Sequence, residues 1–171
     1  MLEAFFPDEV CENIFEIDLE RLSSIGIKGF ILDIDNTLVK PSERIPNREL
    51  LQWIEKVRER GFQLCILSNA SRKRVSSFST GLGIYAISKA RKPASSGFMK
   101  AVRLMELDKS VVCMVGDQLF TDVYGAKKIG IYTLYTRPIV LLEVFTVMLK
   151  RIPEYFIMRC YNKRNRLYED L

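Results

Sequence analysis

Four aspartates stand in two pairs, each directly after a short apolar run. Asp33 and Asp35 close one run, and Asp117 and Asp122 follow another. Two carboxylates placed so close together resist joint ionisation unless a cation or a positive side chain neutralises them. Carboxylate oxygens are preferred ligands of hard divalent cations, and Mg²⁺ also suits the phosphate group of a substrate. The two pairs predict a site where a cation and a phosphate meet.

A hydroxyl group and a cation follow two other apolar runs. Ser68 and Asn69 come after one of them, and Lys92 stands before Pro93 after the other. Taken alone, Ser-Asn is a common helix cap and Lys-Pro a common loop. Because all these groups follow successive apolar runs, we interpret them together as parts of one site.

The sequence contains no histidine. This excludes Ser-His-Asp and Cys-His catalysis and ordinary zinc-hydrolase sites, so acid–base chemistry must come from carboxylates, Lys, Tyr or Cys. The four cysteines are widely spaced without a Cys-x-x-Cys pair, which is typical of the reduced thiols of a cytosolic protein. They are Cys11, Cys65, Cys113 and Cys160.

Five apolar runs predict the strands that must position these groups. Four of them are dense in aliphatic residues without clean polar alternation, as expected of strands covered on both faces. Segments with helical spacing lie between the runs, and this alternation indicates a doubly wound, Rossmann-like α/β fold with a parallel sheet. Ligands of such sheets bind at the carboxyl ends of the strands. The runs are 30–34, 63–67, 84–87, 111–115 and 131–135.

Four helices are expected between these runs. One begins after the N-cap candidate Asn47 and ends at Gly61, and a second follows Ser71. A third has Ser95 or Ser96 available as its cap. The fourth includes the apolar positions 123, 126 and 129.

The four groups together resemble the motifs of a known enzyme family. The resemblance is to the haloacid-dehalogenase-like (HAD) phosphatases, extends roughly over residues 25–136 and includes the order and spacing of every motif. Asp-Asn-Thr-Leu and Gly-Asp-Gln-x-x-Thr-Asp further resemble the YqeG branch of subfamily IIIA, which is related to mitochondrial phosphatidylglycerophosphate phosphatases. The motifs are Asp33-x-Asp35-x-Thr37, Ser68-Asn69, Lys92-Pro93 and Gly116-Asp117-x-x-x-x-Asp122.

The resemblance implies a two-step hydrolysis of a phosphomonoester. Asp33 would attack phosphorus and form an aspartyl-phosphate, which splits one difficult displacement into two. Asp35 would protonate the leaving oxygen and then activate the hydrolytic water. Ser68 and Lys92 would hold the phosphoryl oxygens and neutralise the charge of the transition state.

The same resemblance implies the remaining ligands of the site. Asn69 and Thr37 would orient the loop and the phosphate. Mg²⁺ is the expected metal, although Mn²⁺ fits the same oxygen ligands. Its ligands would be Asp33, the backbone carbonyl of Asp35, Asp117, and Asp122 directly or through a bound water.

The spacing of the motifs leaves no room for a cap domain. About 30 residues separate Thr37 from Ser68, and about 22 separate Asn69 from Lys92, and the expected helices and strands fill both intervals. HAD enzymes with a cap insert it at one of these places. The resemblance therefore implies an open site and a large substrate, such as a protein, a nucleic-acid end or a lipid head group.

The chain length fits a single domain, 1–171, with a core of about 25–136 and a basic helical tail over 137–171. For the tail we favour a terminal helix packed on the sheet over peripheral contact with an anionic membrane, and a subunit contact is a third alternative. The tail combines apolar residues (Val140, Leu141, Val144, Val147, Met148, Ile152, Tyr155, Phe156, Met158) with cations (Lys150, Arg151, Arg159, Lys163, Arg164, Arg166).

The start of the chain lacks the basic and apolar segments of a signal peptide. The longest apolar stretch, 138–149, contains Glu143 and is too short to span a bilayer. We therefore expect a cytoplasmic protein, with peripheral contact at the inner membrane surface as the alternative given by the tail.

The leading functional hypothesis is a phosphatase whose favoured substrate is a phospholipid head group such as phosphatidylglycerophosphate. The alternatives are a phosphatase acting on another phosphomonoester, a receiver-type phospho-accepting domain, or an RNA- or ribosome-associated binding protein. The position of Asp35 argues against the receiver. A net charge of +5 gives only a mild attraction to anions, and the absence of a recognisable RNA-binding module disfavours nucleic acid.

Overall fold

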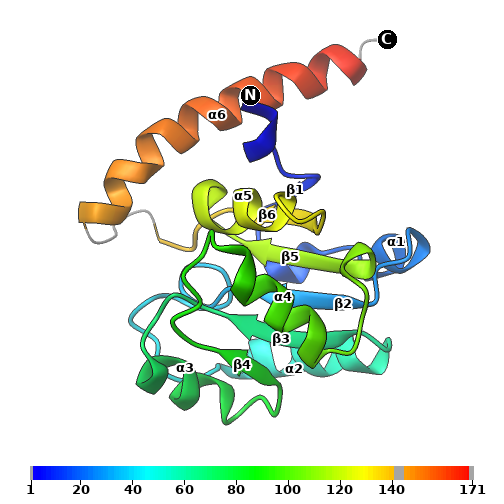
Figure 1. The fold of residues 1–171 in the computed structure, drawn as a ribbon, viewed down its shortest axis with the longest axis vertical. Coiled ribbons are helices and arrows are strands. Elements are labelled where there is room, and N and C mark those ends of the chain that lie inside the picture. The colour runs from blue at the N-terminus through cyan, green and yellow to red at the C-terminus, as the bar shows by residue number, and fades with distance from the viewer. Residues whose placement is uncertain (1, 141–144, 170–171) are drawn as a thin grey trace.

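The computed structural model describes the backbone of residues 2–140 and 145–169, and the side chains of 2–140 and 151–165. A six-stranded sheet forms its centre, with the order β1-β6-β5-β2-β3-β4 and every neighbouring pair parallel (Figure 1). The strands are β1 (Glu9–Cys11), β2 (Gly29–Leu32), β3 (Gln63–Leu67), β4 (Tyr85–Ile87), β5 (Val112–Gly116) and β6 (Tyr132–Thr136).

The five expected strands and the doubly wound α/β fold are confirmed. Strand β1 was not predicted. Its three residues include one branched aliphatic side chain, that of Val10, and therefore form no apolar run. It pairs with β6 at the edge of the sheet, with Glu9 opposite Leu134. Just before it, the Asp8 carboxylate accepts hydrogen bonds from the backbone N–H and the hydroxyl of Thr133, at 2.9 and 2.7 Å. These bonds fix the start of the chain to the sheet.

The α-helices are α1 (Leu19–Ser24), α2 (Arg48–Glu59), α3 (Arg72–Ser79), α4 (Ser95–Leu104), α5 (Tyr124–Lys127) and α6 (Phe145–Glu169). Short helical turns are η1 (Leu2–Phe5), η2 (Ile14–Glu16), η3 (Lys109–Val111) and the π-helical turn η4 (Leu119–Val123).

The predicted N-caps of α2 and α3 are confirmed. The Asn47 side chain accepts from the N–H of Leu50 at 2.9 Å, and the Ser71 hydroxyl accepts from the N–H of Arg74 at 3.3 Å. The expected cap of α4 is wrong: Ala94 is the cap residue, and Ser95 is already the first helical residue. The apolar spacing used for this prediction begins only at Phe98 and does not locate the first turn.

The last expected helix is shorter than its apolar spacing suggested. Residues 119–123 form the π-helical turn η4, and only Tyr124–Lys127 is α-helical. Ile129 lies beyond this helix and packs against the core from the loop before β6.

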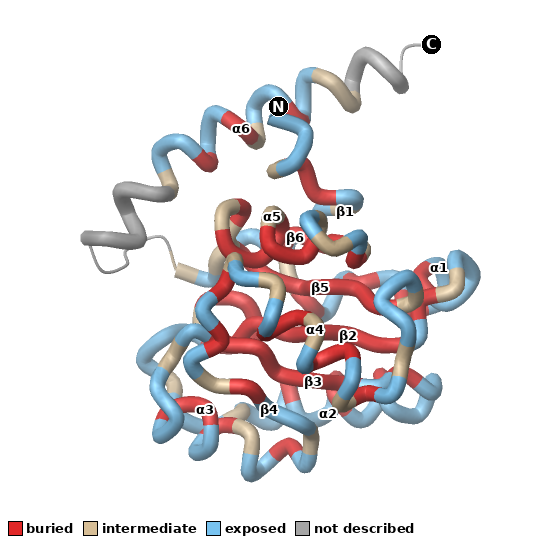
Figure 2. The backbone as a smooth tube through the Cα atoms, viewed as in Figure 1, coloured by how far each residue is buried: buried red, intermediate tan, exposed pale blue. Residues whose placement is uncertain are grey.

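Side chains alternate between the two faces of the sheet, so each face builds its own core. Phe30 and Leu32 of β2 join the cluster formed with α1, α2 and α3, whereas Ile31 joins the cluster formed with α4 and α5. Figure 2 shows the central strands buried throughout. The buried thiols of Cys65 and Cys113 lie in these clusters, and all four cysteines are free.

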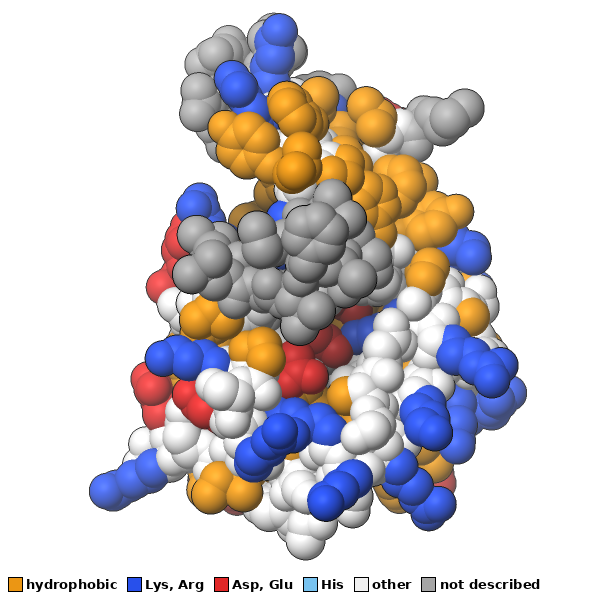
Figure 3. All heavy atoms as spheres, turned by 90° about the vertical axis from the view of Figure 1, so that its left-hand side faces the viewer, with side chains coloured by type: hydrophobic (Ala, Val, Ile, Leu, Met, Phe, Trp, Pro, Cys, Tyr) orange, Lys and Arg blue, Asp and Glu red, His pale blue; other side chains and the backbone are white. Residues whose placement is uncertain are grey.

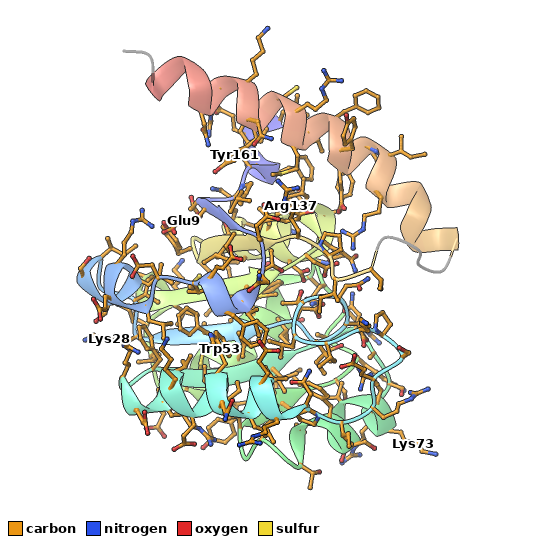
Figure 4. All side chains as sticks on the ribbon, turned by 180° about the vertical axis from the view of Figure 1, so that it is seen from behind. Glu9, Lys28, Trp53, Lys73, Arg137 and Tyr161 are labelled. Atoms are coloured by element: carbon orange, nitrogen blue, oxygen red, sulfur yellow. The ribbon has the colours of Figure 1, made fainter. Side chains whose placement is uncertain are left out.

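Helix α6 runs outside the sheet and covers the N-terminal segment (Figure 1). Ile157 and Tyr161 are buried against Phe6 and Leu119, and the rings of Phe6 and Tyr161 lie 5.7 Å apart, edge to face. Figure 4 shows Tyr161 between α6 and this segment. One side of α6 is packed, as predicted for a terminal helix, and its partners are Phe6, η4 and Tyr135 of the sheet strand β6.

Part of the predicted tail lies outside the described residues: Leu141 and Val144, and the side chains of Val147, Met148, Lys150 and Arg166. Among the helices that the structure describes, none has the length and apolar character needed to cross a bilayer.

Candidate active site

The predicted groups all follow the carboxyl ends of parallel strands. The register of the sheet places these ends at one edge and so brings the groups together. Strand β2 leads to Asp33, Asp35 and Thr37, and its neighbour β3 leads to Ser68 and Asn69. On the other side of β2, strand β5 leads to Asp117 and Asp122. The loop after β4 brings in Lys92. Figure 3 looks onto this face, where acidic side chains are gathered near the centre.

Lys92 links two of the aspartates. Its Nζ lies 2.5 Å from Oδ1 of Asp33 and 2.7 Å from Oδ1 of Asp122, and all three side chains are buried. Burial works against the charged form of the lysine, yet Asp122 and Asp33 together raise the pKa of Lys92 above its usual value. The ammonium group is therefore held beside the predicted nucleophile as a permanent positive charge.

Asp117 is held from two sides. The Thr37 hydroxyl donates to its Oδ1 at 3.2 Å, and Arg151 of α6 forms an ion pair with Oδ2. Nη1 of Arg151 also donates to the backbone oxygen of Asp117 at 2.5 Å and contacts Glu154 at 3.0 Å. The tail thus contributes a cation to the site, which sequence reasoning missed.

The buried carboxylates perturb one another. Burial is the main cause that raises the pKa of Asp33 to about 7, with Lys92 opposing and Asp122 adding to the shift. Burial likewise raises the pKa of Asp117 to about 8, reinforced by Asp33 and opposed by Arg151. In setting these two pKa values, desolvation and like charge therefore outweigh the attraction of Lys92 and Arg151. A further cation would stabilise the ionised form of the cluster.

The donor set fits a hard divalent cation. One carboxylate oxygen from each of Asp33, Asp117 and Asp122 lies within 4.8 Å of the others. Within the described chain, Oδ1 of Asp122 has no hydrogen-bond partner besides its ionic contact with Lys92. An oxygen-only set of three buried carboxylates suits Mg²⁺ or Mn²⁺ better than a softer metal.

The side chain of Asp35 lies outside this carboxylate group. The strand ends at Leu32, and a tight turn follows in which the N–H groups of Leu38 and Val39 donate to the oxygen of Ile34. In an extended strand the side chains of Asp33 and Asp35 would leave the same face, but the turn ends this geometry, and Asp35 is partly exposed.

Arg74 of α3 orients Asp35. Its Nη2 and Nε lie 2.8 and 3.2 Å from Oδ1 of Asp35, and its Nη1 donates to the backbone oxygen of Arg44 at 3.3 Å. The guanidinium is buried and lies 5.3 Å from the centre of the Phe78 ring. Sequence reasoning missed Arg74, because three cations in the first turn of α3 look alike in the sequence.

Asn69 fixes the backbone at Lys92. Its Oδ1 accepts from the N–H of Lys92 at 2.7 Å, and its Nδ2 donates to the oxygen of the same residue at 3.2 Å. The Ser68 hydroxyl is buried and accepts from the N–H of Ala70 at 3.1 Å. The Ser-Asn pair thus lies beside the lysine and holds the loop that carries it.

Gly116 allows the carboxylate of Asp122 to approach the end of β5. A Cβ atom at this position would lie 2.6 Å from both Cγ and Oδ2 of Asp122. Oδ2 instead accepts from the N–H of Gln118 at 3.2 Å. The glycine of the Gly-Asp motif is therefore required by packing inside the site.

The intervals between the motifs contain only core elements. Residues 38–67 form a loop, α2 and β3, and residues 70–91 form α3 and β4 with their loops. No cap domain is inserted in either of these fully described intervals. Helix α6 reaches this edge of the sheet, where its residue Arg151 binds Asp117.

This fold and this site define the class of the protein, and comparisons with known proteins agree. The family model of haloacid dehalogenase-like hydrolases matches residues 41–130, more than half of the chain. An uncharacterized protein from Listeria monocytogenes serotype 4b shares the fold with a TM-score of 0.54, at 20% identity over 69% of this chain and 86% of that chain. The chain belongs to this hydrolase family.

Two curated relatives narrow the class. "Probable phosphatase YqeG" of Bacillus subtilis (strain 168) is 39% identical over 98% of both chains. "Phosphatidylglycerophosphate phosphatase 1, chloroplastic" of Chlamydomonas reinhardtii is 26% identical over 90% of this chain and 61% of that protein. The chain is a HAD-type phosphatase of the YqeG branch, with a more distant relationship to phosphatidylglycerophosphate phosphatases.

Proposed function

We propose that this phosphatase hydrolyses phosphatidylglycerophosphate, with Mg²⁺ and through an aspartyl-phosphate on Asp33. The observation that carries the chemistry is the buried contact of Lys92 with Asp33 and Asp122, beside Asp117. A carboxylate with a fixed cation at its side, at the open end of a sheet, suits attack on a phosphate whose negative charge must be neutralised.

In the first step, a carboxylate oxygen of Asp33 bonds to phosphorus while the bond between phosphorus and the ester oxygen breaks. Asp35 donates a proton to the leaving oxygen, so the alcohol departs neutral. Lys92 stabilises the charge on the phosphoryl oxygens, and Asn69 keeps its backbone in place. Ser68 and Thr37 lie beside the same strand ends to orient the phosphate and the loop.

In the second step, Asp35 accepts a proton from a water molecule that attacks phosphorus and releases Asp33. Arg74 holds Asp35 in a fixed orientation for both proton transfers. Mg²⁺ held by Asp33, Asp117 and Asp122, with the backbone carbonyl of Asp35, would supply positive charge against the phosphoryl group in both steps. The reaction yields the free alcohol and inorganic phosphate.

The lipid substrate is supported by three observations. A relative aligned over 90% of this chain carries the name of a phosphatidylglycerophosphate phosphatase. No cap domain is inserted between the motifs in residues 38–67 or 70–91, so no cap restricts the approach of a large head group. An apolar groove borders the site at Arg151, as described below.

Phosphate release from three substrates tests this proposal. Purified protein with Mg²⁺ is given phosphatidylglycerophosphate in detergent micelles, glyceraldehyde 3-phosphate, or a small generic phosphomonoester, with Asp33→Asn as the blank. We expect the micellar lipid to give the highest kcat/KM and the variant to be inactive on all three. Faster turnover of either soluble ester would refute the lipid assignment and leave the phosphatase class intact.

A further inference from the structure

One face of α6 remains apolar and exposed. Ile152, Tyr155 and Phe156 are 61, 60 and 59% exposed, and their spacing of three and four residues places them on the same face of the helix. The opposite face packs against the protein through Ile157 and Tyr161. Large apolar side chains gathered in this way on a surface indicate an interaction site.

A groove of about 720 Å³ lies between this helix and the edge of the sheet. Val10, Tyr135 and Pro138 line it from the side of β1 and β6, and Ile152, Phe156 and Met158 line it from α6. In Figure 3, hydrophobic side chains gather on α6 and beside it, on the same face of the molecule as the acidic site.

The groove borders the candidate active site at Arg151. Arg151 lines the groove and also binds Asp117. The chain that leaves β6 passes beside the nucleophile loop, because the N–H of Ile139 donates to the backbone oxygen of Asn36 at 3.1 Å and the N–H of Val140 to its side chain at 3.1 Å. A molecule that lay in the groove would therefore lie next to Arg151, which binds one of the aspartates.

Cations accompany the apolar face. The Arg159 guanidinium lies 5.9 Å from the centre of the Tyr155 ring, and Lys163 is exposed one turn further along the helix. Glu154, the acidic residue of the groove, is paired with Arg151. An apolar face beside cations matches an anionic amphiphile, since acyl chains contact the apolar residues while phosphates contact the cations.

We propose that this face of α6 and the groove beneath it bind anionic phospholipid in a bilayer surface. The apolar side chains enter the acyl region of the leaflet that faces the protein, and Arg159 and Lys163 lie at the level of the head groups. This inference deepens the proposed function, because the surface that binds the protein would also contain the substrate. Binding itself requires no catalysis and is measured separately.

Sedimentation with vesicles tests the proposal on the full chain. Wild-type protein is mixed with vesicles of phosphatidylcholine alone or with phosphatidylglycerol added. The test variant combines Ile152→Ser with Tyr155→Ser. The control combines Ile45→Ser with Tyr85→Ser, the same residue types at similar exposures of 69 and 54% but away from α6. Circular dichroism melts establish that both variants are folded.

We expect wild type and control to bind the anionic vesicles alike, and the test variant to bind at least about tenfold more weakly, because two large apolar side chains no longer leave water. Arg159→Gln should weaken binding to anionic vesicles and leave the low binding to phosphatidylcholine unchanged. Wild-type binding no stronger than the phosphatidylcholine background would overturn the proposal, as would equal binding by the test variant. A dimer that the test variant dissociates, without vesicle binding, would assign the face to a second copy instead.

Hydrolysis of phosphatidylglycerophosphate in micelles, measured on the same preparations, separates the two proposals. Vesicle binding without hydrolysis of this lipid would support the proposed membrane-binding surface and refute the proposed substrate. Hydrolysis without vesicle binding would do the reverse.

Discussion

Arg151 and a divalent cation compete for the same carboxylate. Arg151 forms an ion pair with Oδ2 of Asp117, and Asp117 belongs to the group of three carboxylates that fits the cation. We therefore predict that Arg151→Gln binds Mg²⁺ and Mn²⁺ more tightly than the wild type. The substitution removes the positive charge beside Asp117 and, with it, the ion pair with Glu154.

The magnitude follows from the contact. Mg²⁺ lies about 2.0–2.1 Å from its oxygen ligands, so a cation on Asp117 would lie about 4 Å from an arginine nitrogen that stayed in place. Even with the screening of bulk water, two unit charges at about 4 Å repel by about 1 kcal/mol, and a dication repels twice as strongly. About 2 kcal/mol corresponds to roughly thirtyfold in affinity. Because Arg151 can also swing away at the cost of its ion pair, we expect at least about a tenfold gain.

Electron paramagnetic resonance of free Mn²⁺ and calorimetric titration with Mg²⁺ measure this affinity without any turnover. Arg103→Gln, an exposed arginine on α4, is the matched control and should bind metal like the wild type. Unchanged or weaker metal binding by Arg151→Gln would refute the competition and would assign Arg151 the role of holding Asp117 in place for the metal.

Two further predictions concern the buried carboxylates. Gly116→Ala should weaken metal binding by about tenfold or more, because the added Cβ would lie 2.6 Å from the Asp122 carboxylate. In the control Gly81→Ala the added Cβ meets nothing closer than 3.9 Å, so this variant should bind metal normally. Metal titration of both variants checks this. Burial raises the pKa of Asp33 to about 7 and of Asp117 to about 8, above their value of about 3.9 in the unfolded chain. Without metal, the folded protein therefore holds more protons than the unfolded chain between about pH 4 and 8, and its stability falls as pH rises through this window. With EDTA, the melting temperature should be lower at pH 8 than at pH 5 by at least about 2–4 °C, and Mg²⁺ should restore it at pH 8; a melting temperature that rises with pH under EDTA would contradict this.

The positions of the motif residues could be predicted from the sequence because they depend on the sheet alone. Parallel strands with buried faces carry a strong apolar signal, and each polar group follows directly where such a run ends. Asp33, Ser68 and Asp117 therefore had to meet at one edge once the strands were assigned. Lys92 reaches the same edge from the loop after β4, fixed there by Asn69.

The cations that hold Asp35 and Asp117 could not be predicted in this way. Arg74 and Arg151 come from helices, where many exposed arginines look alike in the sequence. Which of them turns inward depends on the path of α3 and α6, and α6 is positioned by Phe6 from the opposite end of the chain. Such long-range packing leaves no local signal.

The central claim is that Asp33 becomes phosphorylated during turnover. Protein mixed with excess phosphomonoester and Mg²⁺ is quenched in acid and reduced with borohydride, which converts an acyl phosphate of aspartate into homoserine. Peptide mass spectrometry then identifies the modified residue. We predict homoserine at position 33 in the wild-type protein and in no peptide of Asp33→Asn, which should release no phosphate. Steady phosphate release without any reducible acyl phosphate, and its persistence in Asp33→Asn, would contradict the account.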